Sequence, residues 1–137
     1  MKIKIIANKK NINFIFSMII LTILFNSCSS KKGVITGYIS YPGQEIPNDL
    51  KVCAINIETG RKFCVQYTDT VYHSYTIKVP EGIYYVYATT NKFEKKAYYT
   101  EFVKCGLKID CPSHEKIKIL VKSNDTIKNI NPQDWYE

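Results

Sequence analysis

Two neighbouring segments that alternate apolar and polar residues constrain this 137-residue chain more than any other feature. In residues 75–79, Tyr-Thr-Ile-Lys-Val, every second side chain is apolar. A repeat of two fits a half-buried strand, whose successive side chains point to opposite faces, and does not fit a helix. Residues 83–88 follow after Pro-Glu-Gly, and this proline and glycine suit a tight turn. The sequence therefore predicts a β-hairpin over residues 75–88.

The second arm of this hairpin is expected to face the core with Tyr84, Val86 and Ala88, and to point Tyr85 and Tyr87 outward. Turn residues recur along the rest of the chain between short β-favouring runs, and eleven tyrosines add to the β preference. Strands at a spacing of about 8–12 residues predict an all-β fold, an antiparallel β-sandwich of about seven strands. The other expected strands are 34–41 (with a bulge or close backbone approach at Gly37), 50–57, 62–67, 97–104, 116–122 and 126–130, and a charged turn is expected at 91–96.

The net charge of +7 gives little reason to expect a nucleic-acid partner. Four lysines fall in the first 27 residues, which hold no acidic residue, so the remaining chain has 15 basic and 12 acidic residues, or +3. The remaining lysines are scattered along alternating strands, whereas a nucleic-acid binder concentrates its basic residues on one face. We therefore expect no nucleic-acid binding.

The first 27 residues have the pattern of a secretory signal peptide, with a basic start and an apolar run over 12–25. This run is shorter than the roughly 20 residues of a spanning helix, although an uncleaved anchor helix is the alternative. The following Phe25-Asn-Ser-Cys28 resembles the lipobox of bacterial lipoproteins. The resemblance implies cleavage after residue 27, acylation (palmitate among the acyl chains) of Cys28 and attachment of the protein to a membrane of the cell envelope. Ser29 in place of aspartate implies the outer membrane if the cell is Gram-negative, and residues 28–33 are expected to form the lipidated tether.

The four other cysteines are expected to form two disulfides, because an exported protein meets an oxidising compartment. If the turn after strand 50–57 is centred between Glu58 and Thr59, Cys53 lies opposite Cys64 on the return strand. Opposed antiparallel residues have Cα atoms about 4.5–5.5 Å apart, which a disulfide tolerates. Elimination and proximity then pair Cys105 with Cys111.

A metal site made by Cys105, Cys111 and His114 is the alternative to this second disulfide, but the spacing Cys-x5-Cys is not usual for zinc. The two histidines, His73 and His114, belong to no catalytic motif that the chain contains. We therefore expect no metal, no cofactor and no enzymatic activity.

Several of these segments together resemble one known family. Val34-Ile-Thr-Gly-Tyr-Ile, then Lys51-Val-Cys-Ala, then the segment 75–88 are similar to the carboxypeptidase regulatory-like domain. The resemblance implies a prealbumin-like (transthyretin-like) sandwich over residues 34–137, including a C-terminal tail outside the general family pattern. It also implies a domain without catalytic residues, which serves as a structural or docking module.

Exposed aromatic residues offer a ligand-binding hypothesis, because flat aromatic rings pack on sugar rings or on partner proteins. The alternative is that the tyrosines are ordinary strand residues beside lysine stems and that Trp135 fixes the C-terminus onto the sheet. The first expected function is a lipid-anchored module with a structural or protein-binding role; the others are carbohydrate binding and docking on an envelope enzyme. The candidate ligand-binding residues are Tyr85, Tyr87, Tyr98, Tyr99, Trp135 and Tyr136.

Overall fold

The computed structural model describes residues 31–67, 71–111 and 113–136, and nearly all of its regular structure is β. The predicted signal peptide and the predicted acylation site Cys28 lie outside the described residues. The strands are β1 (Lys32–Tyr38), β2 (Lys51–Asn56), β3 (Lys62–Gln66), β4 (Ser74–Pro80), β5 (Gly82–Thr90), β6 (Phe93–Tyr98), β7 (Ile119–Val121) and β8 (Thr126–Ile127). One short helix, α2 (Glu101–Lys104), follows β6.

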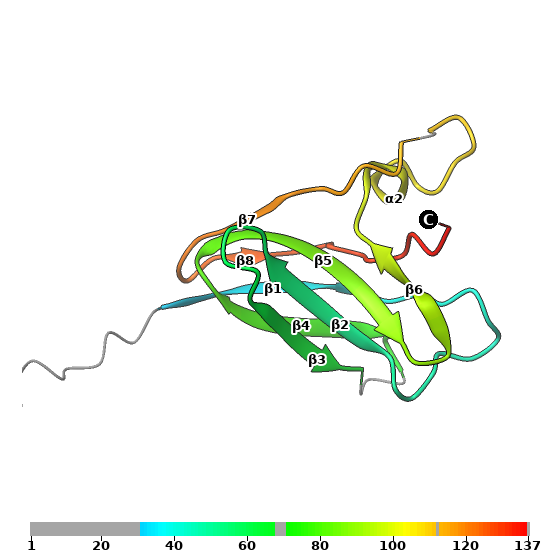
Figure 1. Ribbon diagram of the computed structural model, residues 1–137, viewed down its shortest axis with the longest axis horizontal. Helices are drawn as coiled ribbons and strands as arrows, with labels where there is room; N and C mark the ends of the chain where they lie inside the picture. The colour runs from blue at the N-terminus through cyan, green and yellow to red at the C-terminus, as the bar shows by residue number, and fades with distance from the viewer. Residues whose placement is uncertain (1–30, 68–70, 112, 137) are drawn as a thin grey trace, which may run out of the picture.

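The strands form two sheets that pack face to face as a sandwich (Figure 1). The smaller sheet has the order β4-β1-β8, and the larger sheet has the order β3-β2-β5-β6, with β7 paired to the first half of β5. The predicted all-β sandwich is confirmed. It has eight strands in the described part of the chain, and the β1–β8 pair is parallel, whereas every other strand pair is antiparallel.

The predicted core faces of 75–79 and 83–88 are confirmed. Ile77 and Val79 of β4 are at most 1% exposed, as are Tyr84, Val86 and Ala88 of β5. Each large apolar side chain of this kind stabilises the fold by about 1.5–3 kcal/mol relative to leaving it exposed. The core therefore lies between the two sheets, where the side-chain alternation placed it.

The predicted hairpin over 75–88 is wrong, because its two arms lie in different sheets. β4 pairs with β1 along seven residue pairs, whereas β5 pairs with β2, β6 and β7. Glu81, the one residue between the two strands, is a corner at which the chain passes from one sheet to the other. Gly82 is needed here, because a Cβ at this position would lie 2.5 Å from the Asn56 side-chain nitrogen.

The hairpin of β2 and β3 is confirmed in its register, with Cys53 directly opposite Cys64. Its turn is organised by the side-chain oxygen of Asn56, which accepts hydrogen bonds from the backbone nitrogens of Glu58 and Thr59 at 3.0 and 2.8 Å. Gly60 has φ +70°, a left-handed conformation that costs glycine no steric energy. The turn therefore fixes which residues of the two strands face each other.

Two predictions on the stretch after β5 are wrong. Most of the expected turn at 91–96 belongs to β6, and the expected strand 97–104 ends at Tyr98 and continues into α2. Helix signals compete there with β-favouring residues: the Thr100 hydroxyl caps the helix by accepting a hydrogen bond from Val103 N at 3.4 Å. Glu101 lies in the first turn and Lys104 in the last, which suits the helix dipole.

The last two predicted strands are present but shorter than expected. In 116–122 the alternation places Ile119 and Val121 inward, where they are buried, and Leu120 outward, where it is 58% exposed, although only 119–121 form β7. Of the predicted strand 126–130 only Thr126–Ile127 forms β8. The close backbone approach at Gly37 is confirmed, because a Cβ there would collide with the backbone of Ile130.

Candidate functional site

The outer face of the larger sheet gathers tyrosines and lysines from several strands. Residues paired directly across an antiparallel ladder share a face, so Cys64, Cys53, Tyr87 and Tyr98 form one row across β3, β2, β5 and β6. A second row holds Lys62, Ile55 and Tyr85, and a third pairs Ile83 with Leu120. We call this surface the lysine–tyrosine face; it consists of Lys51, Cys53, Ile55, Lys62, Cys64, Ile83, Tyr85, Tyr87, Lys96, Tyr98, Lys116 and Leu120.

Two tyrosines of this face are covered by lysines. The rings of Tyr87 and Tyr98 have centroids 5.2 Å apart; Lys96 Nζ lies 5.1 Å from the Tyr87 centroid and Lys116 Nζ 4.1 Å from the Tyr98 centroid. Tyr87 does point away from the core, but it is only 4% exposed, because its neighbours enclose it. Burial, followed by the neighbouring Tyr98, raises the pKa of the Tyr87 hydroxyl. Tyr87 therefore offers no open ring to a ligand.

The lysines of the lysine–tyrosine face have no acidic partner among the described ion pairs. Those pairs are Lys104–Glu101 and His114–Asp134, and neither lies on this face. Glu94 of β6, two residues from Lys96, is the nearby exposed acid along that strand. The face therefore carries a local positive charge at Lys96 and Lys116, over Tyr87 and Tyr98. Glu58 and Glu81 lie beside Ile83 and Leu120, in another part of the face.

The six candidate aromatic residues do not form one platform. Tyr85, Tyr87 and Tyr98 lie on the lysine–tyrosine face, whereas Tyr99 packs against the core, and burial followed by the charge of Glu101 raises its pKa. Tyr136 is 69% exposed and meets the edge of Phe102 with ring centroids 6.2 Å apart. These six residues are thus divided between the two sides of the sheet and the C-terminal tail.

Trp135 is 5% exposed, so it does not contribute an exposed ring. Its Nε1 donates a hydrogen bond to the carbonyl of Ser40 at 2.8 Å, and its ring meets Tyr41 and Phe93 with centroids 5.3 and 5.9 Å apart. Tyr41 precedes β2 in the loop after β1, and Phe93 begins β6. The placement of Trp135 therefore agrees with the alternative interpretation, in which it fixes the C-terminus onto the sandwich, and not with the ligand-binding one.

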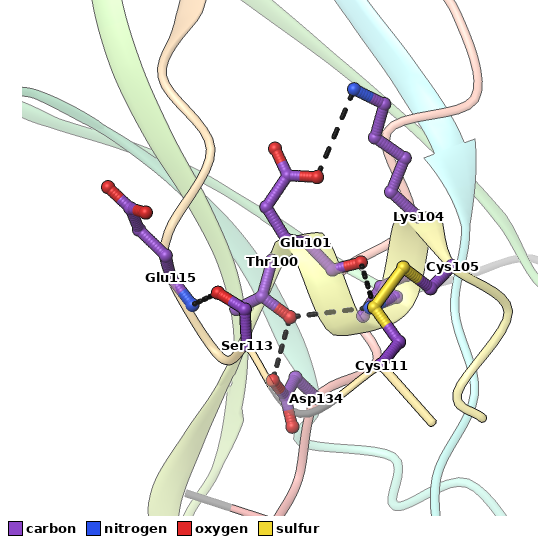
Figure 2. Close-up of a disulfide and its surroundings, with 9 residues drawn as sticks. Thr100, Glu101, Lys104, Cys105, Cys111, Ser113, Glu115 and Asp134 are labelled. Atoms are coloured by element: carbon purple, nitrogen blue, oxygen red, sulfur yellow. Dashed lines mark hydrogen bonds and ion pairs between the residues drawn. A yellow bond between two sulfur atoms is a disulfide. The ribbon is translucent and has the colours of Figure 1, made fainter. Parts of the chain in front are cut away.

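A polar cluster lies beside the second disulfide, and Figure 2 shows two of its members, Thr100 and Asp134. Sequence reasoning did not find this cluster. Asp134, 1% exposed, accepts a hydrogen bond from the hydroxyl of Thr100 at 2.7 Å, and the same oxygen lies 2.7 Å from His114 Nδ1. The His114 ring packs on Phe102 with centroids 4.6 Å apart. In the sequence, Asp134 is 20 positions from His114 and 34 positions from Thr100, so no local motif indicates that the three residues meet.

This cluster holds a histidine and a carboxylate as a catalytic dyad would, but its hydroxyl is already committed. Thr100 is fully buried and donates to Asp134, while the hydroxyl of Ser113 accepts from the backbone nitrogen of Glu115 at 3.3 Å. A nucleophile is recognised by a hydrogen bond to its base, and the described contacts of His114 are with Asp134 and Phe102. The arrangement connects the C-terminal tail to the segment around α2.

Both predicted disulfides are present. Cys53 and Cys64 have Cα atoms 4.1 Å apart, and Cys105 and Cys111 have Cα atoms 6.2 Å apart. Oxidation of the second pair leaves neither sulfur as a thiolate, the form that binds a metal, so the alternative site with His114 does not form. Within the residues that the structure covers, no cluster of three or more His, Cys, Asp or Glu side chains could hold a metal ion.

A pocket of about 560 Å³ lies at the end of the sandwich, against the loop that joins β1 to β2. Its lining comes mostly from residues 39–48, together with Tyr67 and His73. The Tyr67 hydroxyl and His73 Nδ1 are 2.5 Å apart and hydrogen-bonded. The described partners of the two histidines differ: His73 contacts Tyr67, whereas His114 contacts Asp134 and Phe102.

Comparison of the chain with models of known protein families, with curated proteins and with solved structures finds no match. The similarity to the carboxypeptidase regulatory-like domain therefore stays a prediction, and with it the prealbumin-like sandwich type. In the part of the chain covered by the structure, no helix has the length and apolar character required to cross a membrane.

Proposed function

We propose that this protein is a non-enzymatic, lipid-anchored module of the cell envelope that binds a partner through its lysine–tyrosine face. The observation that carries the proposal is the composition of this face: lysines that take part in no described ion pair lie beside a partly exposed apolar centre, on a sheet held by strand pairing and by the Cys53–Cys64 disulfide. A rigid face of this kind loses little conformational entropy when a partner binds.

The anchoring part of the proposal rests on the sequence before the sandwich. In this proposal residues 1–27 are the signal peptide, Cys28 carries the acyl chains and the tether is shorter than the expected 28–33, because β1 begins at Lys32. Acyl chains contribute about 0.8 kcal/mol for each CH2 group buried in lipid, so two or three chains hold a protein durably. The disulfides support export to an oxidising compartment.

The absence of enzymatic activity is supported by what the polar residues already do. The Thr100–His114–Asp134 cluster uses its hydrogen bonds to join the tail to the body, and the hydroxyl of Tyr67 is hydrogen-bonded to His73 between β3 and β4. The similarity to a family of docking modules agrees with this interpretation.

Replacement of the acylated cysteine tests the anchor. The full chain with its leader is expressed as the original protein, as Cys28→Ser and as the matched control Ser30→Ala, in cells fed an alkyne-labelled fatty acid. We expect the original and the control to carry label and to remain with membranes after a high-salt wash, and Cys28→Ser to lose both properties. A Cys28→Ser protein that is cleaved after residue 27 and still stays with membranes would contradict the anchor.

A further inference from the structure

We infer that the lysine–tyrosine face binds an acidic polysaccharide, a chain of sugar rings that carry carboxylate groups. The inference rests on the proposed function and names the class of partner for the same face. Two properties of the face support it: cations held in fixed positions, and an apolar centre that suits the flat C–H surface of a sugar ring.

The fixed cations are Lys96 and Lys116. Each ammonium lies over a tyrosine ring, Tyr87 at 5.1 Å and Tyr98 at 4.1 Å, and this cation–π contact orients the lysine without neutralising it. Neither lysine takes part in the ion pairs of the described residues. Both can therefore bind carboxylates at a lower entropic cost than freely moving lysine side chains.

The apolar centre lies beside these cations. Tyr85 is partly exposed, it is directly opposite Ile55, and it is not among the rings that a described cation covers. Leu120, paired with Ile83 in the neighbouring row, is 58% exposed. A sugar ring packed on Tyr85 would place its carboxylate toward the lysines of the same face. A saccharide chain that lies across the strands could therefore make both kinds of contact at once.

A protein partner fits these observations less well. Protein interfaces obtain most of their binding energy from large side chains that insert into pockets of the partner. Here Tyr87 is 4% exposed and Tyr98 lies under Lys116, so neither ring can insert. A second copy of the chain is disfavoured as well, because two such faces would bring their lysines together.

A bilayer surface also fits less well. Membrane-surface binding needs several apolar side chains that project into the lipid. Of the large apolar residues on the lysine–tyrosine face, Leu120 alone is more than half exposed. The face is therefore better suited to a hydrated polymer than to the lipid interior.

The experiment measures binding of the full-length, lipidated protein in a non-ionic detergent to polygalacturonate, with dextran as the neutral polysaccharide. Calorimetry is expected to show binding to polygalacturonate that weakens as salt is added, because salt screens exposed charges, and no binding to dextran. Lys96→Ala/Lys116→Ala should weaken binding about tenfold, and Tyr85→Ala about fivefold. The matched control Lys78→Ala/Lys128→Ala removes two exposed lysines outside the face and should leave the affinity unchanged.

Three outcomes would overturn the inference. The first is the absence of binding to polygalacturonate by a protein whose circular dichroism and thermal unfolding are normal. The second is equal binding to poly-glutamate with no effect of Tyr85→Ala, which would indicate an acidic protein partner. The third is protection of Lys96 and Lys116 from acetylation by phosphatidylglycerol vesicles but not by polygalacturonate, which would indicate a bilayer. Membrane attachment through Cys28 is measured separately, so any of these results leaves the anchor standing.

Discussion

The body of the sandwich and the C-terminal third of the chain are stabilised in different ways. In the body, seven residue pairs join β1 to β4 and six pairs join β2 to β5. After Tyr98 the strand pairs are short, with three residue pairs between β5 and β7 and two between β1 and β8. The body is thus held by continuous ladders, in which the loss of one contact leaves many others.

The C-terminal third is held at separate points by side chains. The Tyr75 hydroxyl donates to the Ile130 carbonyl at 2.5 Å, Thr100 donates to Asp134, and Trp135 donates to Ser40. These partners are 55, 34 and 95 positions apart in the sequence. Each of these three contacts is a single hydrogen bond, and not one of a series along paired strands. The comparison therefore predicts that single substitutions release the tail more easily than they disturb a ladder of strand pairs.

Trp135→Ala should have the largest effect and tests this difference most directly. Deletion of a buried large aromatic side chain costs about 3–5 kcal/mol in the free energy of unfolding, because contacts are lost and a cavity remains. Hydrogen exchange should show that amides near 130–136 lose protection more than those of β2 and β5. Tyr136→Ala, at the exposed neighbour, should change stability by less than about 0.5 kcal/mol. Equal loss of protection in β2 and β5 would show that the two regions unfold as one unit.

Removal of the disulfides should have the next largest effect. Cys53→Ala/Cys64→Ala opens a bridge across 11 positions and Cys105→Ala/Cys111→Ala one across 6, and loop-closure entropy assigns each about 2–3 kcal/mol. We expect the first pair to lower the midpoint of urea unfolding more, because Cys53 is also buried, at 3% exposed, among the residues of the lysine–tyrosine face. A larger loss from the second pair would mean that the segment around α2 contributes more to global stability than the body's hairpin.

The smallest effect is expected at Asp49, where the body also uses a side-chain contact. Its carboxylate accepts hydrogen bonds from Asn91 N at 2.7 Å and from the Thr90 hydroxyl at 2.8 Å, and these bonds, that of Asn91 first, lower the pKa of Asp49. A carboxyl group with a lowered folded pKa stabilises the protein above its unfolded pKa, and this contribution is lost as the pH falls through the folded value. In urea titrations from pH 7 to pH 2, Asp49→Asn should therefore remove part of the acid destabilisation below about pH 4. An unchanged pH profile would show that the bonds to Asn91 and Thr90 do not stabilise the folded state.

Much of the body could be predicted from the sequence, because local alternation determines which side chains face the core. It placed Ile77, Val79, Tyr84 and Val86 correctly, and the turn after β2 determined the pairing of Cys53 with Cys64. Alternation does not say which strand lies beside which. The segments 75–79 and 83–88 therefore look the same whether they form a hairpin or, as here, cross from one sheet to the other.

The candidate site was less accessible to sequence reasoning. The burial of Tyr87 depends on Tyr98 and Lys96 of another strand, and the cluster at Asp134 joins residues that no spacing rule connects. The helix α2 did leave a local signal, Thr100 followed by Glu101, but this signal lies within a run of β-favouring tyrosine, phenylalanine and valine residues. What the sequence could not supply in each case was a contact between distant segments.

Strand β1 also gives the domain a direction. It begins at Lys32, paired with Pro80 beside the corner between the sheets, and ends at Tyr38, before the loop that lines the pocket. Lys32 comes four positions after Cys28, so the two Cα atoms can lie at most about 14 Å apart, whereas the strand itself advances about 20 Å. With an acyl chain on Cys28, the corner at Glu81 would stay near the lipid headgroups, and the pocket would open toward the aqueous side, within reach of molecules that approach from outside the membrane.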